Sequence, residues 1–164
     1  MPAAEPTLPE IYLRPGELFL AHEPTIIRTI LGSCVGVTFW SEKLGVGALC
    51  HAMLPRVPKL SSTSPTLADG RGYVDFCIFD LARQFDDLGA RRSEIQVKLF
   101  GGADVLALET TAAKPTVGKL NCEAAVEVLQ SEGYDVAASS LGGTVGCKIL
   151  FHTGSGEVLL RRLT

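Results

Sequence analysis

The chain has 164 residues, of which 46% are hydrophobic and 20% are charged, and its formal net charge is −3. A chain of this length forms one domain with a proper core, since it buries roughly 68–70% of its unfolded surface. The basic residues form no long run and no apolar stretch reaches the length of a membrane span, which argues against nucleic-acid-binding and membrane-spanning proteins.

The first ten residues contain three prolines and are predicted to form a loose tail before a single domain over residues 11–164. This tail lacks the basic and apolar regions of a signal peptide, so we expect a cytoplasmic protein. Five cysteines occur without a CxxC pair and are expected to be free thiols in that reducing compartment.

Short apolar and β-branched runs predict the strands of the first third of the chain. These strands are predicted over residues 11–13, 17–21, 26–31, 35–40 and 46–54. The Pro- and Ser-rich residues 55–69 that follow are predicted to form a surface loop.

The fourth and fifth of these strands are predicted to pair as a hairpin around the four-residue loop 41–44. In that register Cys34 lies opposite His51, and Val35 lies opposite Cys50. Directly opposed residues share a face of a sheet, so this spacing permits the Cys34 thiol and the His51 imidazole to meet. Cys50 then points to the other face and is interpreted as a core residue.

Further along the chain, hydrophobic spacing predicts two helices with recognisable ends. The first covers residues 73–88 and stops at Gly89, and the second runs from Asn121 as its N-cap to residue 132, with Gly133 as its terminator. Strands are predicted over residues 94–100, 134–140, 147–152 and 158–163. Because strands outnumber helices and often follow one another directly, we expect an α+β fold with mainly antiparallel pairing.

A cysteine that a histidine base activates is the minimum equipment for nucleophilic catalysis. A metal site built from Cys34, Cys50, His51 and Cys147 is an alternative, but these residues lack the paired spacing of zinc ligands. The Gly-Gly pairs fit neither a P-loop nor a dinucleotide fingerprint and are interpreted as turns. We therefore expect no metal and no cofactor.

Several blocks of sequence, taken in series, carry a family resemblance. Five blocks resemble, in their order and spacing, those of the CheD family of chemoreceptor glutamine deamidases. These blocks are TILGSCVGV, GALCHAMLP, IQVKLFGGADV, VGKLN and SLGGTVGCKILFHTGSGEVLLRRL. The resemblance implies a β-sandwich-like core with flanking helices, similar to the catalytic domain of the cytotoxic-necrotising-factor toxins. It also implies hydrolysis of receptor glutamine amides to glutamate with release of ammonia, and binding of the chemotaxis phosphatase CheC.

The family's functional residues carry over onto matching positions of this chain. The nucleophilic cysteine of the GSC motif falls on Cys34, the histidine of the H-x-M-L-P motif falls on His51, and the threonine that completes the site falls on Thr29. Cys147 stands where the family often has arginine.

Small residues beside the nucleophile are expected to bind substrate. Gly32 and Ser33 leave room for close approach of an amide to backbone N–H groups, and Gly102 is expected to line the cleft where a receptor helix docks. A methyl-glutamate ester offers the same acyl carbon, so methylesterase activity is chemically allowed. The alternative to an enzyme is a non-catalytic partner that regulates CheC, and an intact Cys34 and His51 favour the enzyme.

Overall fold

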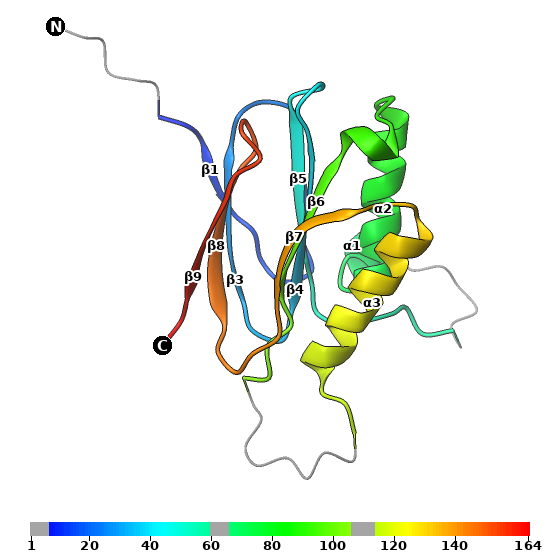
Figure 1. The fold of residues 1–164 in the computed structure, drawn as a ribbon, viewed down its shortest axis with the longest axis vertical. Coiled ribbons are helices and arrows are strands. Elements are labelled where there is room, and N and C mark those ends of the chain that lie inside the picture. Colours follow the sequence, from blue (N-terminus) through cyan, green and yellow to red (C-terminus); the bar gives the residue numbers. More distant parts are fainter. Residues whose placement is uncertain (1–6, 60–65, 106–113) are drawn as a thin grey trace, which may run out of the picture.

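The computed structural model describes residues 7–59, 66–105 and 114–164. Two β-sheets pack face to face, and two helices cover the outer face of the larger sheet (Figure 1). The predicted α+β fold with a sandwich-like core and flanking helices is therefore confirmed. The likeness to the toxin domain and the division into a tail and one domain stay predictions.

The smaller sheet contains the strands that lie farthest from the helices. Its order is β1-β3-β8-β9, with β1 at Glu10–Tyr12, β3 at Ile26–Leu31, β8 at Cys147–His152 and β9 at Val158–Arg162. In β3 the buried residues alternate with more exposed ones, as expected of a strand with one face against a core. That buried face packs against the larger sheet.

The larger sheet lies in the middle of the molecule. Its order is β2-β5-β4-β6-β7, with β2 at Leu18–Ala21, β5 at Val46–Ala52, β4 at Val35–Ser41, β6 at Gln96–Gly101 and β7 at Val136–Leu141. Most pairings are antiparallel, as expected, but β1–β3 and β6–β7 are parallel. Parallel neighbours need a crossover connection, and α3 (Val117–Ser131) supplies the one between β6 and β7.

The hairpin forms, but its predicted register is wrong. Ser41 pairs with Val46, so the loop covers residues 42–45 rather than 41–44. Gly45 lies within the loop at φ +64°, a left-handed conformation that glycine adopts without strain. The Ser41 hydroxyl also accepts a hydrogen bond from the Leu44 N–H at 3.2 Å. The turn therefore uses Gly45 for its backbone conformation and leaves Ser41 to end β4.

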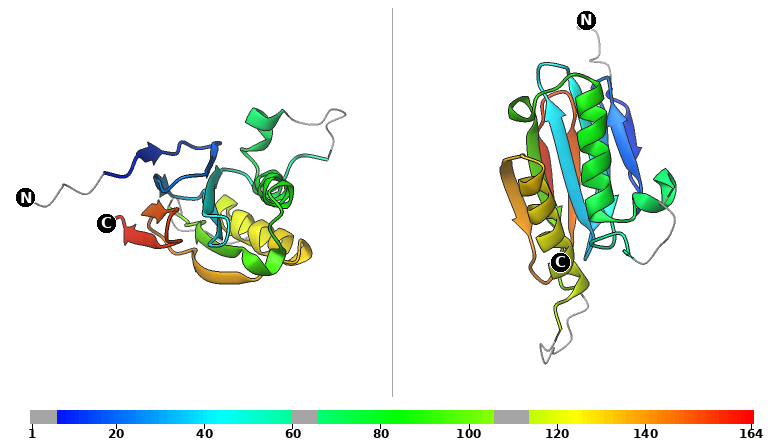
Figure 2. Two further views of the ribbon diagram at one scale, coloured as in Figure 1. Left: turned by 90° about the horizontal axis from the view of Figure 1, so that it is seen from above. Right: turned by 90° about the vertical axis from the view of Figure 1, so that its right-hand side faces the viewer.

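Two helices pack side by side across the outer face of the larger sheet, as Figure 2 shows. The predicted helix over residues 73–88 is α2 (Val74–Asp87). The second begins earlier than predicted, because Thr116 rather than Asn121 is its N-cap and accepts a hydrogen bond from the Lys119 N–H at 3.2 Å. Asn121 lies inside α3 and is completely buried.

Two short elements lie where none was predicted. The helix α1 (Leu67–Gly70) overlaps the end of the predicted loop 55–69, of which residues 60–65 lie outside the described part of the chain. The 3-10 helix η1 (Arg92–Glu94) precedes β6 and includes Glu94, the first residue of the strand predicted over 94–100. Both have fewer than five residues, too short to leave a hydrophobic period in the sequence.

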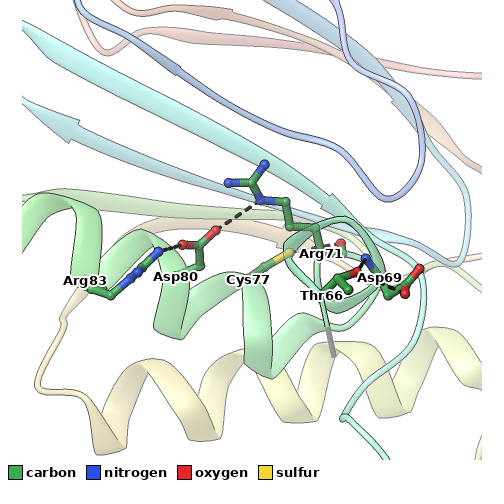
Figure 3. A network of polar contacts seen from close by, with 6 residues as sticks. All are labelled: Thr66, Asp69, Arg71, Cys77, Asp80 and Arg83. Carbon is green, nitrogen blue, oxygen red and sulfur yellow. Dashed lines mark hydrogen bonds and ion pairs between the residues drawn. The ribbon is translucent and has the colours of Figure 1, made fainter. Parts of the chain in front are cut away.

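A polar network ties α1 to α2 (Figure 3). The buried Asp80 carboxylate pairs with Arg71 at 3.1 Å and Arg83 at 2.8 Å, and the Cys77 thiol donates to the Arg71 carbonyl oxygen. These contacts hold the turn that contains Gly72, whose carbonyl oxygen accepts from the two residues that follow β5. The network therefore anchors the chain just beyond His51.

Candidate active site

Cys34 lies where the chain passes from one sheet to the other. Residues 32–34 form a bend that leaves β3 in the smaller sheet and enters β4 in the larger sheet. The Cys34 side chain is half-buried and packs against the apolar cluster between the sheets. Cys34 is therefore partly exposed where the chain passes between the two sheets.

The segment after β6 holds this bend by its backbone. The Gly102 N–H donates to the Cys34 carbonyl oxygen at 2.8 Å, and the Ala103 N–H donates to the Gly32 carbonyl oxygen at 2.9 Å. At Gly101, with φ +99°, a Cβ atom would lie 2.2 Å from that same Cys34 oxygen. Glycine is therefore required here for the two segments to approach. The predicted glycine turn also fixes the position of Cys34.

His51 lies on β5 and faces the layer between the sheets. It pairs with Gly36, not with Cys34 as predicted. The observed register differs from the predicted one by two residues, which preserves the face of every side chain. Cys34 and His51 therefore share a face as diagonal rather than direct neighbours. Cys50 points the other way into the core beneath the helices, as predicted.

Thr29 reaches His51 from the opposite sheet. Its Oγ1 lies 2.7 Å from His51 Nδ1 and 2.7 Å from the Leu13 carbonyl oxygen, and both side chains are buried. A carbonyl oxygen only accepts, so the single hydroxyl proton of Thr29 goes to Leu13. The hydroxyl oxygen must then accept from His51 Nδ1–H. The neutral imidazole therefore keeps its proton on Nδ1 and has a free lone pair on Nε2.

Burial keeps both Cys34 and His51 uncharged. Desolvation lowers the pKa of His51 to about 4, and the charge of Glu17 opposes this shift. Burial also raises the pKa of the Cys34 thiol, while its own backbone N–H acts in the opposite direction. Near neutral pH the pair is thus thiol and imidazole, suited to proton transfer during attack and not to a preformed ion pair.

No hydrogen bond joins Cys34 and His51 in the part of the chain that the structure describes. Catalytic hydrogen bonds are often long without substrate and shorten in the Michaelis complex. The arrangement allows the partly exposed Cys34 thiol to approach His51, whose orientation is already set by its hydrogen bond to Thr29.

The three residues predicted to bind substrate differ in how exposed they are. Gly32 and Ser33 are partly exposed in the bend itself, whereas Gly102 is buried between the bend and α3. A Cβ atom at Gly102 would lie 2.0 Å from the sulfur of Cys122. Their role in binding substrate stays a prediction, and Gly32 and Ser33 are the two of the three that are partly exposed.

The four side chains considered as alternative metal ligands, those of Cys34, Cys50, His51 and Cys147, do not come together. Cys50 belongs to the core beneath the helices, whereas Cys147 belongs to the cluster between the sheets, so the larger sheet separates them. No cluster of three or more candidate ligands occurs within residues 7–59, 66–105 and 114–164. The five cysteines are free.

The prediction from the sequence missed the role of Asn121. Its side-chain Nδ2 donates to the carbonyl oxygens of Ser33 and Met53, which lie next to Cys34 and two residues beyond His51. From the sequence, Asn121 was predicted only to be an N-cap. Helical spacing nevertheless indicates that it is buried, because it precedes three buried residues by three, four and seven positions: Ala124, Ala125 and Val128.

Comparisons with known proteins point to one family. A family model described as CheD chemotactic sensory transduction matches residues 53–162. The chain is 44% identical over 163 residues to the "Probable chemoreceptor glutamine deamidase CheD 2" of Geobacter sulfurreducens, covering 99% of this chain and 96% of that protein. It is 35% identical over 167 residues to the corresponding protein of Maridesulfovibrio salexigens, covering 99% and 97%.

Among solved structures, the hypothetical protein YfiH of Bacillus licheniformis has a TM-score of 0.49 and 11% sequence identity. That match covers 75% of this chain and 49% of the other. Within the described residues, no helix is both long and apolar enough to span a membrane.

Proposed function

The chain belongs to the CheD family, and on this premise we propose that it is a hydrolase that converts specific glutamine side chains of chemoreceptors to glutamate. The relatives are named for this activity. The observation that carries the proposal is the hydrogen bond from His51 Nδ1–H to Thr29, because it leaves Nε2 free on the face that Cys34 shares.

The first half of the reaction forms a thioester. His51 Nε2 takes the proton from the Cys34 thiol as the sulfur attacks the carboxamide carbon. The tetrahedral intermediate places negative charge on its oxygen, next to backbone N–H groups of the bend. The imidazolium then gives its proton to the amide nitrogen, the C–N bond breaks and ammonia leaves.

The second half repeats the proton transfers with water. Water loses a proton to His51 Nε2 and attacks the thioester carbon, and the proton returns to the sulfur as the glutamate product departs. A receptor methyl ester has the same acyl carbon and a better leaving group, so methylesterase activity belongs to the same proposal.

The partners follow from the family. We propose that the protein acts in the cytoplasm on the helices of methyl-accepting receptors and also binds the phosphatase CheC. A protein that only binds CheC would have no use for an oriented histidine beside an accessible thiol, so the enzyme is the better supported of the two.

The test is to incubate a folded receptor cytoplasmic fragment with the protein and follow ammonia release and the mass of receptor peptides. Each converted glutamine replaces an amide nitrogen by oxygen and gains mass accordingly. Cys34→Ala is the matched control, since it removes one sulfur atom of volume together with the nucleophile. Receptor or CheC binding without a mass change in the wild type would favour the non-catalytic partner.

A further inference from the structure

Asn121 connects the two segments that carry the proposed nucleophile and base. From α3 its side-chain Nδ2 donates to the Ser33 carbonyl oxygen at 2.9 Å and to the Met53 carbonyl oxygen at 3.0 Å. Ser33 immediately precedes Cys34, and Met53 follows His51 by two residues. One amide group therefore spans the bend between the sheets and the end of β5.

The orientation of this amide follows from its partners. Both partners are carbonyl oxygens, which only accept, so the NH2 group rather than the oxygen must face them. Asn121 is 0% exposed, and its Oδ1 has no hydrogen-bond partner among the described residues. A buried, unpaired oxygen lowers stability, and an apolar side chain of similar size would avoid that cost. The presence of asparagine therefore points to a need for its two N–H donors.

The hydrogen bond to Ser33 also sets the direction of the next N–H group. The chain contains no cis peptide bond within the described residues, so the Ser33 carbonyl and the Cys34 N–H point in opposite directions. With the carbonyl held by α3, the Cys34 N–H points away from the helix. This N–H belongs to the same residue as the sulfur that would carry the tetrahedral carbon, so it lies a few bonds from the place where the oxyanion would form.

We propose that Asn121 is a positioning residue, which holds the Ser33–Cys34 peptide so that the Cys34 N–H donates to the oxyanion that forms during attack. This inference rests on the proposed function. Asn121 itself does not touch substrate, because it is buried behind the bend. Its second bond, to Met53, keeps the end of β5 at a constant distance from the same peptide.

The experiment compares Asn121→Leu and Asn121→Ala with the wild type on the receptor fragment. The expected result is a kcat at least tenfold lower with KM changed less than twofold, because a donor to the oxyanion acts in the transition state. Val128→Ala is the matched control, since Val128 is buried on the same helix, seven residues after Asn121, in the core between the helices and the larger sheet. It should lose thermal stability yet keep kcat.

Two further measurements do not depend on turnover. Hydrogen exchange of the peptide containing residues 32–35 should accelerate in both Asn121 variants and not in Val128→Ala, and alkylation of Cys34 by iodoacetamide should change rate in the same two variants. Unchanged kcat and unchanged exchange in folded Asn121 variants would overturn the inference. If the wild type does not deamidate the fragment, the proposed function fails, and the exchange and alkylation rates still decide whether Asn121 holds the bend.

Discussion

At the scale of single residues, the Thr29 hydroxyl determines what His51 can do. Its only proton is committed to the Leu13 carbonyl oxygen, so it accepts from His51 and selects the tautomer with a free Nε2. A residue of the same shape without a hydroxyl would leave Nδ1–H and the Leu13 oxygen buried and unpaired.

Thr29→Val should therefore lower both activity and stability. We expect kcat to fall at least about tenfold, part of the roughly 10²–10⁴-fold that a positioned general base contributes. The unpaired groups should lower the free energy of unfolding by about 1–3 kcal/mol. Steady-state deamidation and urea unfolding are the measurements. Thr29→Ser keeps the hydroxyl and should retain most of the activity; equal losses in both variants would show that the methyl group, not the hydroxyl, matters.

The buried imidazole of His51 should make stability depend on pH. Its pKa falls from 6.5 to about 4 on folding, so between these values the unfolded chain binds a proton that the folded protein does not. Stability is thus retained above about pH 6.5 and declines as the pH falls toward 4, by about 2 kcal/mol at pH 5. Urea unfolding of the wild type and His51→Gln from pH 8 to pH 5 isolates this contribution as the difference between their slopes. Parallel pH profiles would contradict the assigned pKa.

At the scale of elements, the candidate active site depends on close contacts between segments of backbone. Gly101 ends β6, Gly102 follows it, and both support the bend that carries Cys34. Gly118 lets α3 approach them, since a Cβ there would lie 2.6 Å from the Ala103 oxygen. The proposed nucleophile Cys34 is thus positioned by the packing of β6 and α3 against its bend as well as by the strands β3 and β4 on either side.

Two glycines with almost the same φ angle allow the effect of backbone strain to be separated from the effect of packing. Gly102→Ala and Gly45→Ala both place a Cβ at positive φ, +66° and +64°, which costs roughly 1–2 kcal/mol in each case. Only at Gly102 does the added atom clash, with Cys122 at 2.0 Å. Gly102→Ala should therefore lose more stability and most of its deamidase activity, whereas Gly45→Ala should stay active. Thermal melts and turnover by both variants test this, and similar activities would mean that the bend tolerates movement of β6.

At the scale of the whole molecule, the segments that adjoin the candidate site, just after β5, just after β6 and at the start of α3, carry exposed apolar side chains. Met53, Val105 and Val117 are all more than a third exposed, and Val105 lies within 3.5 Å of the space beside Gly32. Such exposed side chains suit contact with a protein surface better than recognition of the charged groups of a free amino acid.

We therefore expect a folded receptor fragment to be a much better substrate than free glutamine. A single side chain offers few atoms for binding, whereas contacts with a helix remote from the amide can position it and lower the barrier. Comparing kcat/KM for free glutamine, short glutamine peptides and the folded fragment provides the test. Comparable values for free glutamine would identify a small-molecule amidase instead.

The sequence by itself determined the strands, the two long helices and the shared face of Cys34 and His51. Strand periodicity is local, and an error of two residues in register leaves every side chain on its face. Cys34 and His51 therefore share a face although the predicted turn and register were wrong. The N-cap of α3 was misplaced because Asn121 and Thr116 both suit a cap by type, and only packing shows which one is free to do so.

The tertiary structure alone decided how the candidate site is supported. Thr29 contacts Leu13 and His51 across two sheets, and Asn121 reaches Ser33 and Met53 across 88 and 68 positions of the chain. Buried polar groups must find partners, but which partners they find depends on how sheets and helices stack, and no period in the sequence encodes that. The family resemblance indicated Thr29 as a site residue, whereas the hydrogen bonds show that its hydroxyl donates to the Leu13 carbonyl oxygen and accepts from His51 Nδ1–H.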